Sequence, residues 1–314
     1  MLLPEMLQGQ PYEMADPEFG GLVSGNARVW RLWSGAAWAE GPVWFQDRGC
    51  LLFSDIPNDR MLRFTPDPSG LMGRVDVFRQ PAGYTNGHTR DREGRLVSCE
   101  HGGRRVVRTE HDGTITVLAE RWNGGRLNSP NDVAVKGDGT VWFTDPPYGI
   151  LSDFEGHKGD MEYGACHVFR FDPATGDLAV AADDFVKPNG ICFSPDERTL
   201  YVADTGASHD PDGPRHIRRF EVGDDNRLSG GGVFATCDVG LFDGFRCDDR
   251  GRVWTSAGDG VHCYAPDGRL LGKVKVPEVV ANVAFGGAKR NRLYVCATTS
   301  LYAVQLHVNG ALRP

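Results

Sequence analysis

The sequence has little of what nucleic-acid-binding and membrane-spanning proteins need. Lys and Arg number 34 against 42 Asp and Glu, for a formal charge of −8, and no block of Lys or Arg occurs. Because clustered cations bind phosphate backbones, we expect no nucleic-acid partner. No apolar run approaches the ~18 residues of a membrane-spanning helix, so we expect no membrane partner. Residues 1–20 lack the basic and apolar segments of a signal peptide, which predicts a cytoplasmic protein, or a periplasmic one if a leader has been removed.

Motifs for several kinds of chemistry are also missing. The eight cysteines are scattered without a Cys-x-x-Cys pair, so we expect buried, reduced thiols and no cysteine-based zinc or redox centre. No Gly-x-Ser-x-Gly motif occurs, which argues against a covalent acyl-enzyme. No phosphate-cradling P-loop is present either.

Turn residues and one internal repeat dominate what remains. The 41 Gly and 19 Pro are typical of an all-β protein with many turns. A unit made of a polar residue, a short apolar run, a turn and a second apolar run recurs six times. In every copy the second run ends 14 or 15 positions after the polar residue. The polar residues that open the copies are Glu40, Asn86, Asn131, Asn189, Asp243 and Asn282.

Each copy predicts a β-hairpin, and further strands follow most of the hairpins, as at 61–65 and 167–171. Six such units predict an all-β fold, a six-bladed β-propeller with four-stranded blades. The sixth unit ends near Val308, so we expect an N-terminal strand at 29–33 to complete its blade and close the ring. The predicted boundaries are an N-terminal extension at 1–27 and a single propeller domain at 28–314.

The six repeat-opening residues should meet on the propeller axis, because equivalent positions of the innermost strands face the same small volume. All six are oxygen donors, and none is His or Cys. Buried carboxylates and amides without a partner are costly, and a hard cation such as Ca²⁺ takes oxygen ligands of this kind. The sequence therefore favours a divalent cation on the axis, the alternative being a water-filled polar channel.

A second set of acids ends four of the second strands, one shell further out. These residues are Asp55, Glu100, Asp145 and Asp204. They could orient the axial ligands or bind a polyol, or they could lock the blades by accepting backbone N–H bonds. We favour the locking role.

Several motifs together resemble the gluconolactonase / senescence marker protein (regucalcin) family, and most closely its bacterial gluconolactonase branch. The motifs cover the chain from about residue 30 to 308, and any one of them alone is weak. They lie at 40–44 (EGPVW), 53–57 (FSDIP), 98–105 (SCEHGGRR), 129–132 (SPND), 143–149 (FTDPPYG), 187–190 (KPNG) and 243–245 (DGF).

The resemblance implies a six-bladed propeller with one axial divalent cation. Carried over by position, the ligands are Glu40, Asn131, Asn189 and Asp243. Calcium is the preferred ion, with zinc, manganese and magnesium as alternatives. In the regucalcin branch an Arg two residues before the Asn of the third blade helps to hold the substrate. This sequence has Ser129 there, so that contact is not carried over.

The resulting functional hypothesis is hydrolysis of a sugar lactone of the glucono-1,5-lactone type to the aldonic acid. The cation would polarise the carbonyl, and Asp243 would assist the attack of water. The residues expected to contact the substrate are Asn86, His88, Asn131, Tyr148 and Asn282. The alternatives are a non-catalytic calcium-binding propeller, or a phosphotriesterase or aryl-ester hydrolase, since related propellers carry those activities. We expect a monomer or a homodimer.

Overall fold

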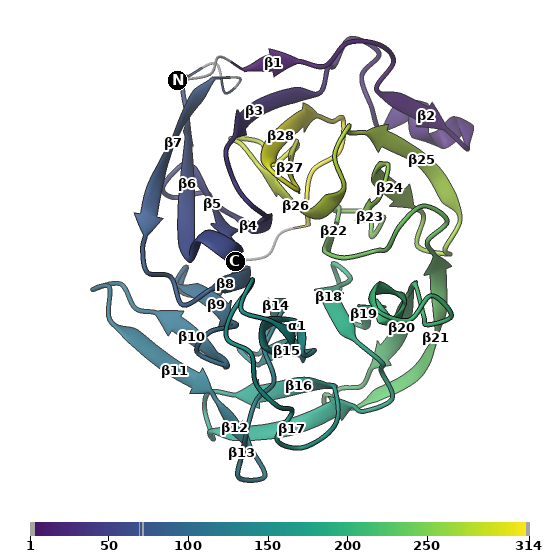
Figure 1. Ribbon diagram of the computed structural model, residues 1–314. Helices are drawn as coiled ribbons and strands as arrows, with labels where there is room; N and C mark the ends of the chain where they lie inside the picture. The colour runs from purple at the N-terminus through teal and green to yellow at the C-terminus, as the bar shows by residue number, and fades with distance from the viewer. Residues whose placement is uncertain (1–3, 69, 71, 312–314) are drawn as a thin grey trace.

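Six antiparallel sheets surround a central axis in the computed structural model, which describes residues 4–68, 70 and 72–311 (Figure 1). In each sheet the strands follow one another from the axis outward, and neighbouring strands are antiparallel. The first blade consists of β4 (Ala39–Phe45), β5 (Cys50–Asp55), β6 (Arg60–Pro66) and β7 (Gly73–Arg79). The second consists of β8 (Thr85–Arg90), β9 (Leu96–Glu100), β10 (Arg105–Thr109) and β11 (Ile115–Ala119). The third consists of β14 (Val133–Val135), β15 (Val141–Asp145), β16 (His167–Asp172) and β17 (Asp177–Ala182).

The other three blades repeat this order, and the N-terminal segment adds strands to two of them. The fourth blade consists of β18 (Pro188–Phe193), β19 (Thr199–Asp204), β20 (His216–Val222) and β21 (Leu228–Thr236). The fifth consists of β22 (Phe245–Cys247), β23 (Val253–Ala257), β24 (Gly260–Tyr264) and β25 (Leu270–Lys275), and is extended by β2 (Tyr12–Met14). The sixth consists of β26 (Val280–Gly286), β27 (Arg292–Ala297) and β28 (Ser300–Gln305), and is extended by β3 (Trp30–Ser34) and β1 (Glu5–Met6). The predicted six-bladed propeller is confirmed.

The ring closes where β3 pairs with β28, as expected for the segment 29–33. The stretch 1–27 also carries β1, which pairs with β3, and β2, which pairs with β25. The 3-10 helix η1 (Pro17–Gly21) follows, and its Phe19 is fully buried against Trp254, with ring centroids 6.1 Å apart. Residues 5–6 and 12–14 thus pair with strands of the last two blades.

The hydrophobic core lies between neighbouring blades, because each sheet buries both faces against the next sheet. Between the third and fourth blades, for example, Trp142 packs edge-to-face on Phe193, with ring centroids 5.5 Å apart. All eight cysteines are free and buried, as the absence of paired spacing predicted.

Short helices and loops occupy the face where the second strands end. They include η2 (Ile56–Asn58) in the first blade, α1 (Tyr148–Leu151) in the third and η3 (Gly206–Ser208) in the fourth. A small hairpin, β12 (Arg121–Trp122) and β13 (Gly125–Arg126), lies between the second and third blades. None of the helices in the described ranges is long and apolar enough to cross a membrane.

Candidate functional site

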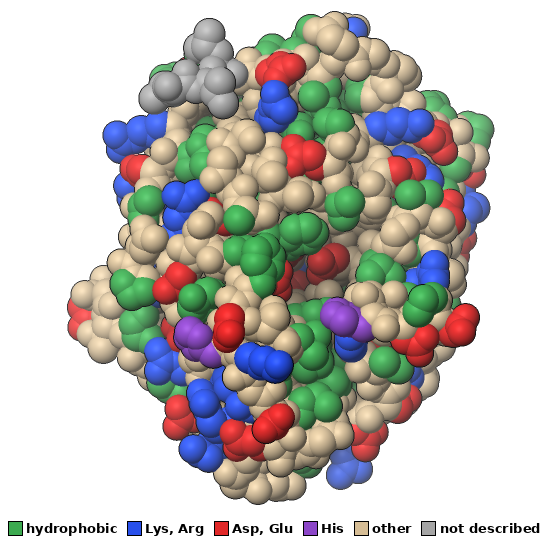
Figure 2. All heavy atoms as spheres, in the orientation of Figure 1, with side chains coloured by type: hydrophobic (Ala, Val, Ile, Leu, Met, Phe, Trp, Pro, Cys, Tyr) green, Lys and Arg blue, Asp and Glu red, His purple; other side chains and the backbone are tan. Residues whose placement is uncertain are grey.

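The residues that open the six repeats lie where the innermost strands begin or just before them. In four blades the pairing of the first two strands shifts register at this point, between Glu40 and Val43 for example, and between Val280 and Asn282. In the other two blades, Asn131 and Asp243 lie two residues before the first residue of β14 and β22. Such bulges re-aim side chains at a strand end, and here they turn the polar groups toward the axis. Figure 2 shows this face, with a hollow at the centre and acidic side chains at its floor.

Glycines allow the blades to approach one another closely around the axis. A Cβ on Gly41 would overlap the carbonyl oxygen of Asn86, and one on Gly190 would overlap that of Asp243. Gly244 lies equally close to the side chain of Asn282. The repeat places Gly after the polar residue in four of its six copies because only a residue without a side chain fits this close contact.

Two carboxylates face each other across this ring. Glu40 is 3% exposed; its Oε1 accepts a hydrogen bond from the Gly41 N–H at 2.9 Å, and its Oε2 has no partner. Burial raises the pKa of Glu40 to about 8. Burial and then the charge of Glu40 raise the pKa of Asp243 well above its ordinary value. Two such groups are costly to ionise together, and a bound cation would remove that cost.

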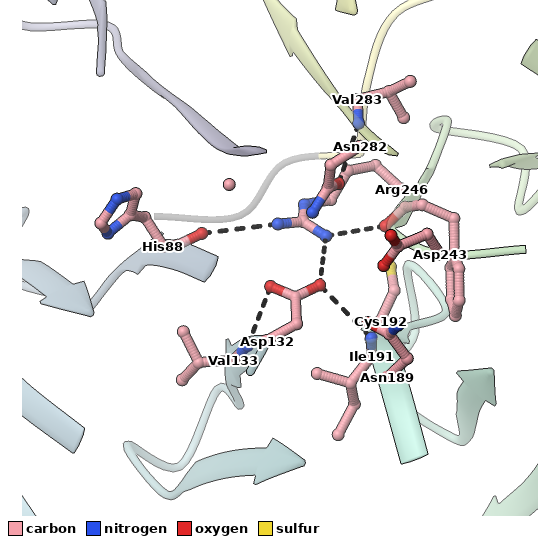
Figure 3. Close-up of polar contacts among 12 residues, drawn as sticks. His88, Asp132, Val133, Asn189, Ile191, Cys192, Asp243, Arg246, Asn282 and Val283 are labelled. Carbon is pink, nitrogen blue, oxygen red and sulfur yellow. Dashed lines mark hydrogen bonds and ion pairs between the residues drawn. The ribbon is translucent and has the colours of Figure 1, made fainter. Parts of the chain in front are cut away.

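The amide of Asn189 is oriented by its neighbours in the same blade. Its Nδ2 donates to Thr205 Oγ1 at 3.3 Å, and Thr205 Oγ1 in turn donates to the Lys187 carbonyl at 3.1 Å. The buried Oδ1 of Asn189 has no partner. In Figure 3 this side chain lies beside Asp243. Its free oxygen is therefore available to a ligand on the axis.

His101 orients Asn86 in a similar way. The imidazole Nδ1 lies 3.1 Å from the Glu155 carbonyl, which can only accept, so the proton is on Nδ1. Nε2 must then accept from the Asn86 amide nitrogen, 3.3 Å away, which leaves Asn86 Oδ1 free. Burial lowers the pKa of His101 to about 4 and keeps the ring neutral.

The remaining two amides differ from each other. Asn131 is 5% exposed, and its backbone joins two blades, because its carbonyl accepts the Gly87 N–H at 2.8 Å. Asn282 uses its Oδ1 to accept the Val283 N–H at 2.8 Å. Its amide nitrogen thus remains for Glu40, and this interaction offsets part of the rise that burial causes in the pKa of Glu40. Asn282 therefore acts as a donor to a carboxylate, and its oxygen is turned away from the axis.

The donor set fits a hard divalent cation. Two carboxylates can balance its charge, and the unpartnered oxygens Glu40 Oε2 and Asn189 Oδ1 are ligands of the kind that calcium takes. Within the described residues no three His, Cys, Asp or Glu side chains cluster in a way that could hold a metal ion. A site here must therefore combine the two carboxylates with amide oxygens.

Residues 38–299 match the model of the SMP-30/Gluconolactonase/LRE-like region. The chain belongs to this family. A gluconolactonase of Zymomonas mobilis is 29% identical over 94% of this chain and 85% of its own length. The pentonolactonase XacC of Haloferax volcanii is 30% identical over 82% of this chain and 80% of its own. The solved gluconolactonase of Xanthomonas campestris has a TM-score of 0.87 and 37% identity, covering 95% of each chain. The predicted family resemblance is confirmed.

Two of the expected substrate contacts, His88 and Tyr148, have polar atoms that already bind protein groups. His88 is fully buried, and its two ring nitrogens lie 2.8 Å from Ser54 Oγ and Ser98 Oγ. The structure does not bring its ring to the axial site, because both nitrogens already bind the neighbouring strands. Tyr148 lies at the mouth of the site, but its hydroxyl binds Thr205 Oγ1 at 2.7 Å and Ser208 Oγ at 2.9 Å.

An ion pair on the axis was missed by sequence reasoning. Asp132 takes the place that Gly has in four of the other copies, and its Oδ2 lies 3.2 Å from Arg246 Nη1 of the fifth blade (Figure 3). Arg246 also donates to the Phe245 carbonyl at 2.8 Å and to the His88 carbonyl at 3.4 Å. The positive charge of the guanidinium offsets a small part of the rise that burial causes in the pKa of Glu40. The signal in the sequence was the departure from Gly at position 132.

Arg246 separates the site from the other end of the axis. It lines a cavity of about 450 Å³ together with Trp44, Phe193 and Phe285, which lie toward the far ends of the innermost strands. The oxygen ring and this cavity are thus on opposite sides of the half-buried Arg246.

The outer acids bind protein atoms, as we favoured from the sequence. Asp55 Oδ1 accepts the Ala37 N–H at 2.8 Å, and Asp204 accepts the N–H groups of Val186 and Lys187 at 3.0 and 2.9 Å. Asp55 and Asp204 thereby fix the loops that lead into the innermost strands of their own blades, and Asp145 does the same by accepting the Asn128 N–H at 2.7 Å. Glu100 instead accepts from Arg105 Nε at 2.6 Å, and Asp145 Oδ1 has no partner.

Proposed function

We propose that this protein is a metal-dependent lactonase that hydrolyses a sugar lactone of the glucono-1,5-lactone type to the aldonic acid. The observation that carries the proposal is that Glu40 Oε2 and Asn189 Oδ1 are buried beside Asp243 with no protein group to satisfy them. The prediction of a lactone-hydrolysing enzyme is confirmed by the named relatives. The relatives act on gluconolactone or pentonolactone by name, which supports a polyhydroxylated substrate.

The proposed ligands of the cation are Glu40, Asn131, Asn189 and Asp243, with calcium preferred because every donor is oxygen. When bound, the ion would supply Lewis-acid polarisation of the lactone carbonyl. The protein's own contribution is to hold these four groups at fixed orientation. Thr205 fixes the amide of Asn189 through its hydroxyl.

Asp243 is the proposed general base. It is only half-buried, whereas Glu40 is enclosed, so Asp243 is the carboxylate that water can reach. It would accept a proton from the water that attacks the carbonyl carbon. Asn86, whose amide nitrogen is held by His101, would offer its oxygen to a substrate hydroxyl. Asn282 would keep Glu40 in place by donating to its carboxylate.

The test is hydrolysis of glucono-1,5-lactone, followed by pH-stat titration above the spontaneous rate. Activity should disappear after chelation and return on addition of Ca²⁺, Zn²⁺, Mn²⁺ or Mg²⁺. Glu40→Gln and Asp243→Asn should each lose both activity and bound metal, whereas Asp225→Asn at an exposed turn should lose neither. A metal-bound protein inert on every lactone would favour a binding propeller, and activity restricted to phosphotriesters or aryl esters would favour the other hydrolases.

A further inference from the structure

A long connection in the third blade crosses toward the site and is held in place from two blades. It joins β15 to β16 over residues 146–166. Ser129 fastens its start, since its hydroxyl donates to the Pro146 carbonyl at 2.6 Å and accepts the Gly149 N–H at 2.9 Å. Within the loop, the N–H of His157 binds the Gly149 carbonyl at 3.0 Å. The loop has a defined shape before any ligand binds.

The second blade holds the same loop at residue 155. His101 Nδ1 donates to the Glu155 carbonyl at 3.1 Å, and Arg104 Nη2 donates to the Asp160 carbonyl at 3.1 Å. The ring of Tyr84 contacts His157, with centroids 5.1 Å apart. Because His101 also holds Asn86, the backbone of Glu155 is tied to the oxygen ring through one imidazole.

The side chain of Glu155 differs from the other acids of this loop. Asp153 accepts the Lys158 N–H at 2.8 Å, Glu162 accepts the Arg126 N–H at 2.7 Å, and Asp160 is exposed. Glu155 is half-buried, and its carboxylate makes no hydrogen bond or ion pair with the described part of the chain. Its backbone carbonyl is linked to the amide of Asn86 through the two nitrogens of His101, which places residue 155 beside the oxygen ring.

A half-buried carboxylate without a partner is unfavourable unless something binds it. Its two oxygens can accept hydrogen bonds from hydroxyl groups, and charge-assisted bonds of this kind are among the stronger ones. A polyhydroxylated lactone at the site brings such hydroxyls on the ring carbons beyond the carbonyl. Burial alone raises the pKa of Glu155 to about 7, which agrees with a group that has no cation of its own.

We propose that Glu155 is a specificity-determining residue that binds hydroxyls of the lactone ring and selects polyhydroxylated lactones over unsubstituted ones of the same ring size. The proposal rests on the proposed lactonase function and names what that site recognises. A site built to bind a hydroxyl discriminates strongly against a substrate that lacks it, because the buried acceptor is then left unpaired.

The test compares glucono-1,5-lactone with δ-valerolactone, which has the same ring and no hydroxyls. Wild type should prefer the hydroxylated lactone. Glu155→Gln and Glu155→Leu should lower kcat/KM for it by about 10- to 150-fold, the worth of a hydrogen bond to a charged group, mainly through KM. Their kcat/KM for δ-valerolactone should stay at the wild-type value. Asp160→Asn, in the same loop, is the matched control and should change neither substrate.

An equal loss on both lactones, or no loss on either, would overturn the role of Glu155 while leaving the lactonase function standing. A wild type that prefers δ-valerolactone would do the same. If wild type with metal hydrolyses neither lactone, the proposed function itself fails. Thermal unfolding of each variant separates these outcomes from a folding defect.

Discussion

Four of the six repeats supply polar groups at two places on the same face, and the two sets of residues differ in their hydrogen-bond partners. Of the outer acids, Asp55 and Asp204 are satisfied by N–H groups of their own blade. Glu100 pairs with Arg105, and Asp145 accepts the Asn128 N–H through Oδ2 while its Oδ1 has no partner. In the inner ring, Glu40 Oε2 and Asn189 Oδ1 are buried without a partner. Asp55 and Asp204 therefore stabilise the fold, whereas Glu40 and Asn189 each keep a buried oxygen that can bind a ligand. Burial does not distinguish Asp55 from Glu40, since both are buried, whereas their hydrogen-bond partners do.

The comparison is tested most severely by Asp243→Asn. This change removes the proposed base and one of two ligand charges, so we expect turnover to fall by about 10²- to 10⁴-fold. Metal-free stability should stay level or rise, because repulsion between Glu40 and Asp243 is relieved. Turnover and urea unfolding on the same preparations measure both effects. A variant that loses stability without losing turnover would place Asp243 in the structural class.

Arg246→Met tests whether the axial ion pair is structural. It leaves Asp132 buried without its cation, and breaking a buried pair in this way costs about 3–5 kcal/mol of unfolding free energy. The double variant Asp132→Asn with Arg246→Met should recover much of that loss. A single variant as stable as wild type in chemical denaturation would show that the pair does not support the fold.

Asp55→Asn is the counterpart of Asp243→Asn in the outer set. Asp55 is fully buried and also accepts from Arg60 Nε at 2.8 Å, so the amide leaves that guanidinium without its anion. We expect a loss of about 2–4 kcal/mol in unfolding free energy. Turnover of the folded enzyme at low temperature should be unchanged. Lost turnover at full stability would contradict the division between the sets.

The smallest effect concerns acid stability. Burial lowers the pKa of His88 to about 3, below its ordinary value near 6.5, so the unfolded chain binds the extra proton between these values. Stability should therefore fall as pH drops through this window, by up to about 1.4 kcal/mol per pH unit for this one proton. His88→Gln should reduce that slope in urea titrations from pH 7 to 4.5, with His111→Gln at an exposed turn as control. An unchanged slope would mean that His88 is charged in the fold.

The propeller architecture and the residue types of the axial ring could be predicted because both follow from the spacing and the first residue of the sequence repeat. A spacing of 14 or 15 positions identifies the hairpins, and equivalence of the first residues places Glu40, Asn189 and Asp243 together. The closure by β3 follows from the missing fourth strand of the last unit.

Other parts of the site depend on contacts between repeats, which spacing within a repeat does not encode. Arg246 reaches across the axis to Asp132, and the two residues belong to different repeats, so the sequence does not indicate that they form an ion pair. Asn282 shares its position with Asn189, yet a bond to its own neighbour Val283 turns its oxygen away. The approach of Glu155 depends on the path of a loop that no repeat describes.

The pairing of β3 with β28 has a consequence for biosynthesis. These strands are separated by nearly the whole chain, so a nascent polypeptide emerges from the ribosome with β3 exposed and waiting for a partner made last. The final step of assembly is then a long-range docking, which is slow and leaves unpaired strand edges available for aggregation. We therefore expect chaperones to bind the nascent chain mainly at the unpaired β3 edge until β28 has been synthesised.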